Sequence, residues 1–484
     1  MELHRKLTHQ PGSIVEASSN SVEGFSAGAV LFQIGYTMIV LLAEVIVGDL
    51  TSLRSRVFFS FVPTLPWLII SWVSGDVAKA VLGATTWRWG IGMWCIIYFV
   101  MVIPLIISLQ IPAWRAKKAG ALTQYKTPFQ KLGAKKLAVQ LFWQLDVIGV
   151  ILLIAVFALV LVPFTIAGGA SSQWGKGKVI APLVIGLLCI PAWLFWEMKA
   201  PHPLVPFHLL RDRGVWGALG VSFMLAFSWY MQGDFLYTVL IVAFDESIKS
   251  ATRITTLFSF CSVITGTILG LVIIKVRYIK PFIIFGTAIW LGAFGVLIYY
   301  RGGSSSSAHS GIVGAQVMLG IGGGFFTYPA QASIQANTKH EHLAVITGLY
   351  LAVYNLGAAF GNTVSGAIWT QIVVPTLESN LPVPYNNATT AAAIFGDPFT
   401  YALNYTVGTP VRDGIIVSYR HVQRLLCITG ICLCIPLIIF ALCLRNPRLG
   451  KEQSLPTAET EVGIEGLTED GQKKENRTFW SKLF

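Results

Sequence analysis

The chain has 484 residues, of which 54% are hydrophobic and only 12% are charged. Soluble domains carry about 25% charged residues on average, so this composition excludes a soluble enzyme. The net charge of +12 would suggest a nucleic-acid partner in a soluble protein. Here, basic loops on the cytoplasmic side of a membrane explain it, and no nucleic-acid partner is expected.

Long apolar runs recur along the chain, which predicts an all-α polytopic membrane protein embedded in a lipid bilayer. Residues 1–25 are polar and lack the apolar core of a signal peptide. After them we expect about eleven membrane-spanning helices, at residues 26–48, 57–83, 89–110, 146–167, 179–197, 215–243, 254–274, 281–300, 311–334, 343–374 and 423–444.

The distribution of lysine and arginine predicts the orientation. If the basic loop 111–145 is cytoplasmic, the cytoplasmic loops hold 23 of the 35 lysines and arginines. The long loop 375–422 is then extracellular, and the tail 445–484 is cytoplasmic. Two glycosylation sequons, at Asn387 and Asn404, fall in that extracellular loop and are expected to be accessible to glycosylation.

Acidic and basic residues mark the first span and the loop after it. Glu44 lies well inside the span, where a carboxylate must be protonated, paired or facing a wet cavity. It is either a proton-coupling group or an acid neutralised by a neighbour for structural reasons. Asp49 precedes Arg54 and Arg56, and a salt bridge between the acid and one of these arginines would serve as a cytoplasmic gate.

The second span carries an acid and a base near its outer end. Asp76 and Lys79 are three residues apart and share a helix face, which is compatible with a plain surface pair or with a cavity role. Trp72 lies one turn earlier and would place an indole ring beside the acid.

Polar residues also interrupt the sixth span. Gln232, Asp234 and Tyr237 would line a cavity or mark the extracellular end of the helix, and Asp234 is a second candidate for proton coupling. The sequence leaves open whether Arg253 pairs with Asp234 or with the acids at 245–246.

The strongest cavity candidates are polar side chains set into the ninth and tenth spans. Tyrosines with hydrogen-bonding neighbours suit a bulky, partly apolar ligand, although helix packing with polar contacts is the alternative. These candidates are Tyr328, Gln331, Tyr350, Tyr354 and Asn355.

The chain shows no signature of catalysis or of a bound metal. His340 and His342 are two residues apart, and this spacing does not converge on a metal in a helix. No nucleophile–base set and no phosphate-binding loop is present in the sequence. We therefore expect no enzymatic activity, no cofactor and no protein-bound metal.

Five stretches resemble the fungal siderophore–iron transporters of the major facilitator superfamily. The resemblance extends over about residues 25–445, and the segments WRWGIGMW and GGGFFTYPAQASIQA are specific to this group. The five stretches are Gly35–Arg56, Pro63–Asp76, Trp87–Trp94, Gln232–Ile254 and Gly320–Trp369.

The resemblance implies the major facilitator fold and a division of the chain. Members of this group have fourteen spans, arranged as six, two linking and six, and the first span here matches their fourth. The N-terminal bundle is therefore expected to be incomplete. The implied units are a polar segment 1–25, a partial N-terminal bundle of three spans 26–110, a basic cytoplasmic loop 111–145, two linking spans 146–197, a C-terminal six-helix bundle 198–444 and a cytoplasmic tail 445–484.

The resemblance also implies a function, namely import of ferric hydroxamate siderophores by proton symport. The plasma membrane is the expected location, with endosomal or vacuolar membranes as alternatives. A glutathione/proton exchanger, a heme carrier and a drug/proton antiporter are competing functions within the superfamily. The antiporters' Gly-Pro motif is absent at Ser74–Val77, which favours import. A truncated membrane protein that does not transport is the alternative from another class.

Overall fold

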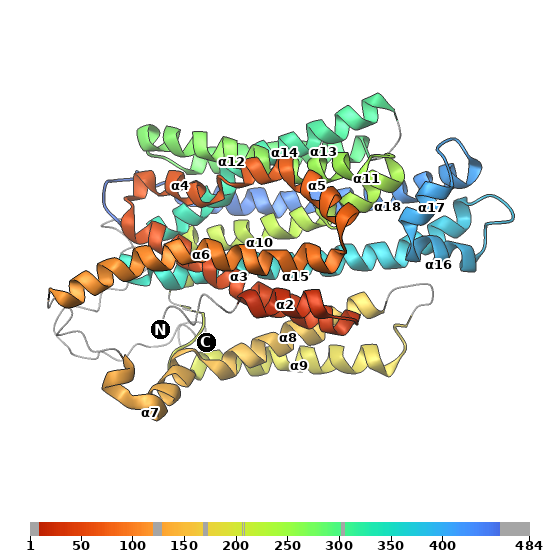
Figure 1. Ribbon diagram of the computed structural model, residues 1–484. Coiled ribbons are helices and arrows are strands. Elements are labelled where there is room, and N and C mark those ends of the chain that lie inside the picture. The colour runs from red at the N-terminus through yellow and green to blue at the C-terminus, as the bar shows by residue number, and fades with distance from the viewer. Residues whose placement is uncertain are drawn as a thin grey trace, which may run out of the picture.

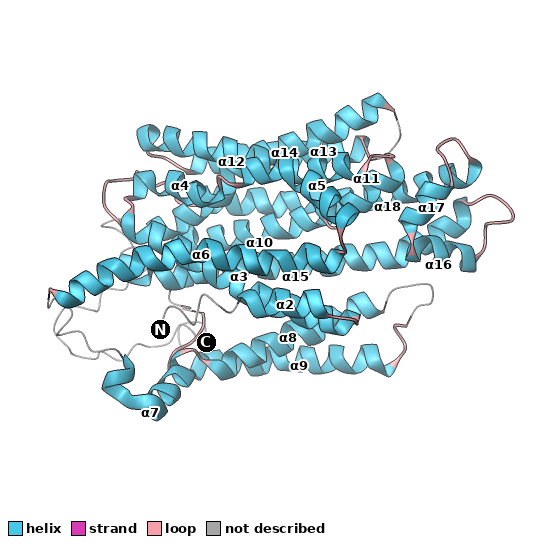
Figure 2. Cartoon of the chain, viewed as in Figure 1, coloured by secondary structure: helices cyan, strands magenta, loops and turns pink. Residues whose placement is uncertain are grey.

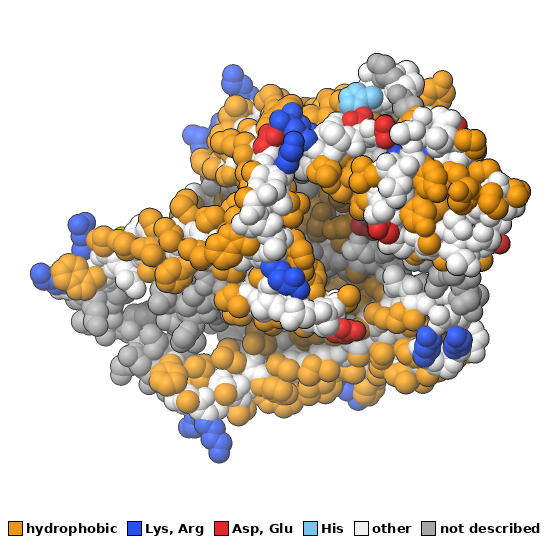
Figure 3. Space-filling view, turned by 45° about the vertical axis from the view of Figure 1, so that its right-hand side comes forward, with side chains coloured by type: hydrophobic (Ala, Val, Ile, Leu, Met, Phe, Trp, Pro, Cys, Tyr) orange, Lys and Arg blue, Asp and Glu red, His pale blue; other side chains and the backbone are white. Residues whose placement is uncertain are grey.

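The computed structural model describes residues 9–119, 128–167, 173–205, 207, 209–301 and 305–454. Every regular element in these ranges is a helix, as Figure 2 shows. Eleven helical segments among the described residues are long and apolar enough to cross a membrane, so the expected fold class and span number are confirmed. Hydrophobic side chains cover most of the face seen in Figure 3, as expected for helices that meet lipid.

Six long helices form the C-terminal bundle and run side by side (Figure 1). Helices α12 and α13 both pack on α14, and α10 packs on α15 and α18. The bundle core contains Trp290, whose indole Nε1 donates to Ser228 Oγ at 3.1 Å. The six helices are α10 (Arg213–Gly233), α12 (Ile248–Val276), α13 (Lys280–Tyr299), α14 (Ser306–Ala336), α15 (Leu343–Asn380) and α18 (Pro410–Cys443).

Glycine lets two pairs of these helices approach closely. A Cβ atom on Gly324 of α14 would lie 2.7 Å from the backbone oxygen of Ser262 in α12. A Cβ atom on Gly357 of α15 would lie 2.2 Å from the backbone oxygen of Phe223 in α10. Any side chain at these positions would force the helices apart, so the close packing requires glycine.

The N-terminal helices pack against one side of this bundle. Helices α4 and α5 lie against α12, and α3 contacts α15. The expected second span is broken at Val62–Thr64 (η1), where Pro63 and Pro66 interrupt the helical hydrogen bonding. The elements are α2 (His9–Ser18), α3 (Val22–Leu50), α4 (Leu53–Phe61), α5 (Trp67–Ala84) and α6 (Trp87–Lys118). The polar N-terminal segment therefore contains a helix, α2, which packs on α3 and α6.

The two linking spans form a hairpin that contacts the bundle through α15. Helices α8 (Val147–Ile166) and α9 (Gly177–Lys199) pack on each other, and α8 contacts α15. Asp146 caps α8 by accepting from Gly149 N, and it also accepts from Trp196 Nε1 of α9 at 2.7 Å. In the basic loop, α6 continues to Lys118 and α7 covers Pro128–Gln144, while residues 120–127 lie outside the described residues.

The start of the last helix of the C-terminal bundle differs from the sequence expectation. Helix α18 begins at Pro410 rather than near 423, because Arg412, Asp413 and Arg420 lower the hydropathy of its first turns. The connection from α15 to α18 is correspondingly shorter and contains two short helices, α16 (Ala388–Gly396) and α17 (Pro398–Asn404).

The sixth span is divided as well. Helix α10 ends at Gly233, and α11 (Leu236–Ala243) follows after a break at Asp234 and Phe235. Of the expected tail, residues 445–454 are described, and 455–484 lie outside the described residues.

Candidate functional site

The carboxyl group of Glu44 joins three helices from both parts of the molecule. Its side chain on α3 is only 4% exposed. Glu44 Oε2 accepts from Ser60 Oγ of α4 at 3.1 Å and from Gln331 Nε2 of α14 at 2.7 Å. Both donors are neutral, and among the described residues Glu44 takes part in no ion pair. The acid is therefore held by hydrogen bonds rather than by a cation.

Tyrosines gather next to this carboxyl group. Tyr328 lies one turn before Gln331 on α14, and its ring meets Phe61 edge-on with centroids 4.7 Å apart. Glu44, Tyr36, Tyr350 and Tyr354 all lie within electrostatic range of the Tyr328 hydroxyl. The structure therefore brings four of the sequence candidates, Tyr328, Gln331, Tyr350 and Tyr354, together with Glu44.

The two tyrosines of α15 are not equivalent. Tyr350 is 3% exposed, and its hydroxyl donates to the backbone oxygen of Thr327 in α14 at 3.0 Å. Its own backbone oxygen accepts from Ser222 Oγ of α10 at 3.1 Å. Tyr354 is half-buried. Tyr350 is thus committed to helix packing, whereas Tyr354 keeps part of its surface exposed.

Other expected cavity residues lie elsewhere. The Asn355 amide donates to Leu351 O in its own helix at 2.9 Å. Gln232 is buried in the C-terminal bundle, where its Oε1 accepts from Gln316 Nε2 at 2.9 Å. Tyr237 meets Phe399 of α17 edge-on.

Asp234 forms a second acidic site at the break between α10 and α11. Its carboxylate accepts from the Ser365 hydroxyl of α15. When the Asn362 amide is oriented so that its nitrogen faces Asp234, Asn362 Nδ2 donates to the two carboxylate oxygens at 2.9 and 2.8 Å. Like Glu44, this acid is held by neutral donors on a neighbouring helix.

Asp76 pairs with α12 and not with Lys79. Its carboxylate lies 2.6 Å from Lys249 Nζ and 3.3 Å from an Arg253 nitrogen. The Arg253 guanidinium also lies 5.5 Å from the centroid of the Trp72 ring. The expectation that Arg253 pairs with Asp234 or with the 245–246 acids is therefore corrected. The reason is that α5 packs along α12, which brings Asp76 to ion-pair distance of Arg253.

The expected salt bridge between Asp49 and an arginine is also absent. Asp49 lies 3.7 Å from His340 Nε2, and no ion pair with Arg54 or Arg56 is formed among the described residues. Arg56 is 1% exposed and donates instead to backbone oxygens, including that of Gln453 at 2.9 Å. The segment after α18 therefore supplies an acceptor for Arg56, which was expected to pair with Asp49.

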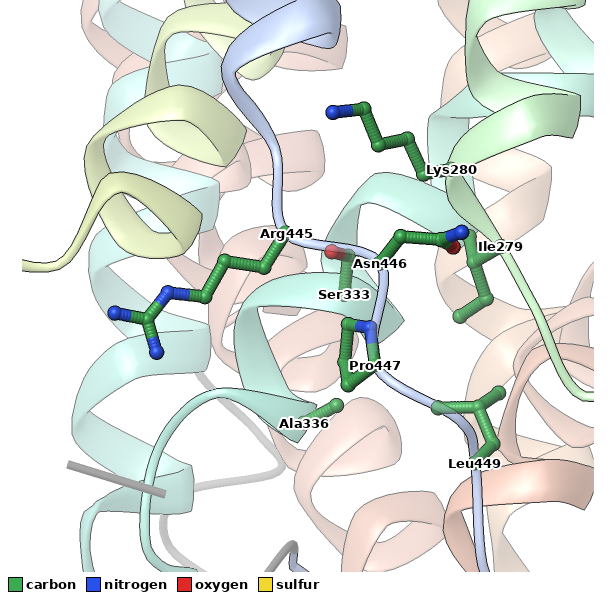
Figure 4. A pocket seen from close by; sticks show the side chains of 8 residues that line it. All are labelled: Ile279, Lys280, Ser333, Ala336, Arg445, Asn446, Pro447 and Leu449. Atoms are coloured by element: carbon green, nitrogen blue, oxygen red, sulfur yellow. The ribbon is translucent and has the colours of Figure 1, made fainter. Parts of the chain in front are cut away.

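That segment connects the two parts of the molecule at the end where α18 finishes. Leu449 N donates to Arg277 O at 2.9 Å, and Leu53 N donates to Glu452 O at 2.9 Å. Arg445 Nε lies 2.9 Å from Asp212. Figure 4 shows that Arg445, Asn446, Pro447 and Leu449 of this segment lie among Ser333 and Ala336 of α14 and Ile279 and Lys280 at the start of α13.

The two sequon asparagines are exposed. Asn387 begins α16, where its Oδ1 accepts from Thr390 N at 2.8 Å, and Asn404 ends α17. Among the described residues, no group of three or more His, Cys, Asp or Glu side chains could hold a metal ion.

Sequence reasoning missed two members of the Glu44 site. Ser60 and Tyr36 both contribute hydroxyl groups from apolar helices. The available signal was a hydroxyl side chain within an apolar span, but such residues are common, and only the packing of α3 against α4 and against the C-terminal bundle selects these two.

A superfamily model matches part of the chain. Residues 217–376 match the family model of the Major Facilitator Superfamily. The solved structure of a bacterial homologue of the human lysosomal transporter Spinster, inward-facing and occupied, aligns with a TM-score of 0.38 at 13% identity, over 91% of this chain and 95% of that chain.

Curated relatives then identify the family. Siderophore iron transporter 1 of Saccharomyces cerevisiae is 47% identical over 450 residues, which cover 92% of this chain and 70% of that protein. Siderophore iron transporter ARN1 of the same yeast is 40% identical over 442 residues, which cover 90% of this chain and 70% of that protein. The chain therefore belongs to the siderophore–iron transporter family of the major facilitator superfamily.

Proposed function

We propose that this protein imports ferric siderophores of the hydroxamate type by proton symport. The relatives' names support siderophore iron as the cargo. The observation that carries the coupling mechanism is the position of Glu44, which is buried and hydrogen-bonded to helices of both parts of the molecule.

The Glu44 site can connect proton binding to helix movement. Alternating access requires the N-terminal helices to rock against the C-terminal bundle. The bond from Gln331 to Glu44 crosses that boundary, so any rocking at this level must break it or move it. Protonation of the carboxyl group weakens the bonds that it accepts, because hydrogen bonds to an ionised group are about twice as strong as neutral ones. Proton occupancy therefore biases which arrangement of the two parts is favoured.

Asp234 is a second candidate for proton binding, since its donors, Ser365 and Asn362, are also neutral. Both of its partners lie on α15 of the same bundle, so it does not cross the boundary as Glu44 does. We assign the coupling role to Glu44 and a supporting role within the C-terminal bundle to Asp234.

The tyrosines beside Glu44 suit the proposed cargo. A ferric hydroxamate is bulky and compact, and its iron stays wrapped in the chelator, so aromatic contact and a few hydrogen bonds are sufficient for recognition. Tyr350 is buried, which leaves Tyr36, Tyr328 and Tyr354 as the members of the cluster with exposed surface. We propose them as direct contacts for the siderophore.

The charge distribution supports an orientation with the α16–α17 connection outside and the segment after α18 in the cytoplasm. Import for nutrition would place the protein in the plasma membrane. In an endosomal or vacuolar membrane, where the lumen is the outer side, the same proton symport would operate.

Uptake in yeast tests the proposal. The protein is expressed in cells that lack their own siderophore uptake, and radioactive iron is supplied as a ferric hydroxamate or as an inorganic salt. Saturable uptake of the hydroxamate alone, faster at pH 5 than at pH 7.5, is the expected result. Uptake of the hydroxamate that does not differ from that of empty cells would reject siderophore import. Uptake that is equally fast at both pH values would reject proton symport.

A further inference from the structure

Three arginines lie near the connection between α13 and α14, far along the chain from Glu44. Arg301 follows the end of α13, while Arg420 and Arg424 are four residues apart on α18 and share a helix face. Burial, and then the positive charges of Arg424 and Arg420, lower the pKa of Arg301. Arg301 and Arg420 also line the same cavity, so two like charges lie near each other.

Among the described residues, none of the three arginines forms an ion pair with a carboxylate. The recorded contact of the Arg301 guanidinium is a hydrogen bond from NH1 to Ile298 O at 2.7 Å, which leaves most of its donors available. Unpaired arginines gathered in one place raise the local positive potential, which attracts anions.

The arginines border a cavity of about 350 Å³ that is open to the surface. Arg301 and Arg420 line it together with the hydroxyl-bearing residues Tyr299, Tyr300, Ser305 and Ser307. The volume exceeds that of a single phosphate group, so the cavity can hold a phosphate together with part of a larger molecule. Serine hydroxyls and arginine forks are the groups that most often bind phosphate oxygens.

The first turn of α14 adds to the positive potential of this cavity. Ser305 caps the helix, because its hydroxyl oxygen accepts from Ala308 N at 3.2 Å, and the helix that follows runs to Ala336. The N-terminus of a long helix carries a partial positive charge. It reinforces the attraction that the arginines exert.

The neighbouring tyrosines indicate the depth of the cavity in the membrane. Tyr299 ends α13 with 74% of its surface exposed, and its ring lies against Tyr300 with centroids 4.8 Å apart. Exposed tyrosines at the end of a membrane helix are typical of the lipid headgroup level. The cavity is thus within reach of lipid headgroups and of water.

We propose that this cavity is a binding site for a phosphate-bearing anion, held by Arg301 and Arg420 and attracted by Arg424. The same chemistry is offered by the headgroup of an anionic phospholipid and by free phosphate.

The test uses the purified full chain in a neutral detergent, with thermal unfolding as the measurement. One arm is titrated with short-chain phosphatidic acid and the other with inorganic phosphate, at constant ionic strength set with chloride. Phosphatidylcholine is the control lipid. A saturable rise in the unfolding midpoint is expected in at least one arm. A rise with the lipid alone identifies a headgroup site, and a rise in both arms identifies the phosphate group itself as the ligand.

Variants connect the rise to this cavity. R301Q and R420Q are each expected to weaken the apparent Kd by about tenfold or more, the loss typical of one charged hydrogen bond. R448Q removes an exposed arginine after the far end of α18 and should bind like the wild type. R301K and R420K, which keep the charge, replace any glutamine variant that fails to fold and should bind with intermediate affinity. No saturable rise in either arm, or equal affinity in wild type and in R301Q and R420Q, would overturn the proposal.

Discussion

Replacement of Glu44 by glutamine separates proton coupling from structure. Glutamine has the same shape, and its amide oxygen can accept from Ser60 Oγ and Gln331 Nε2 as the carboxyl oxygen does at 3.1 and 2.7 Å. The link between the N-terminal helices and the C-terminal bundle is therefore retained. What Glu44→Gln removes is the ability to take up and release a proton.

The expected loss can be calculated. A gradient of one pH unit is worth about 1.4 kcal/mol per proton, which supports about tenfold accumulation of a neutral substrate carried with one proton. Purified protein is reconstituted in liposomes with pH 7.5 inside and 6.5 outside, with the membrane potential clamped at zero and radioactive iron in the siderophore. The wild type should reach that ratio of about ten, whereas Glu44→Gln should stop near one.

Two controls make this result specific. Exchange of labelled for unlabelled siderophore without a gradient should persist in Glu44→Gln, because binding and rocking do not require the proton. Glu341→Gln changes an exposed acid in the same way and should accumulate like the wild type. Tenfold accumulation by Glu44→Gln would refute the assignment of the proton to this residue.

Three further predictions concern the tyrosines and the topology. Tyr354→Ala should weaken siderophore affinity by about 1–3 kcal/mol in equilibrium binding, as loss of a contacting aromatic ring does, and unchanged affinity would exclude the contact. Tyr350→Phe removes the hydrogen bond to Thr327 O and should lower the free energy of unfolding by about 0.5–1.5 kcal/mol without changing siderophore affinity. A change in siderophore affinity alone would contradict the packing role of Tyr350. Asn387→Gln and Asn404→Gln should each remove one glycan and so increase the electrophoretic mobility of the protein. A C-terminal tag should stain only in permeabilised cells, and staining of intact cells would reverse the proposed orientation.

The sequence predicted the helices and the central carboxyl group because these depend on local composition. Glu44 stands out since an acid within an apolar run needs an explanation, and Gln331 stands out in the same way on α14. Their contact over 287 positions is a property of the folded chain and could not be read from spacing.

Ion pairs were the least predictable feature. Asp76 has Lys79 one turn away, yet it pairs with Lys249, because the packing of α5 on α12 brings that amine to 2.6 Å. Likewise, Arg56 contacts the chain near Gln453 and not the nearby Asp49. Local spacing shows which charges can share a helix face, but tertiary packing decides which of them meet.

The start of helix α18 also depended on tertiary packing. The start of α18 was missed because Arg412 is polar in sequence but 0% exposed in the structure, where it pairs with Asp245 at 3.2 Å. A hydropathy criterion treats such a residue as loop, although an acid in the connection between α11 and α12 pairs with it.

Simultaneous measurement of proton and siderophore movement tests the central claim most directly. Liposomes that contain the purified protein and a pH-sensitive dye start with equal pH on both sides, with the membrane potential clamped at zero, and a ferric hydroxamate is then added outside. Proton symport through Glu44 predicts that the interior acidifies as siderophore enters, and that Glu44→Gln carries siderophore without acidification. Siderophore entry by the wild-type protein with no change in internal pH would contradict the account.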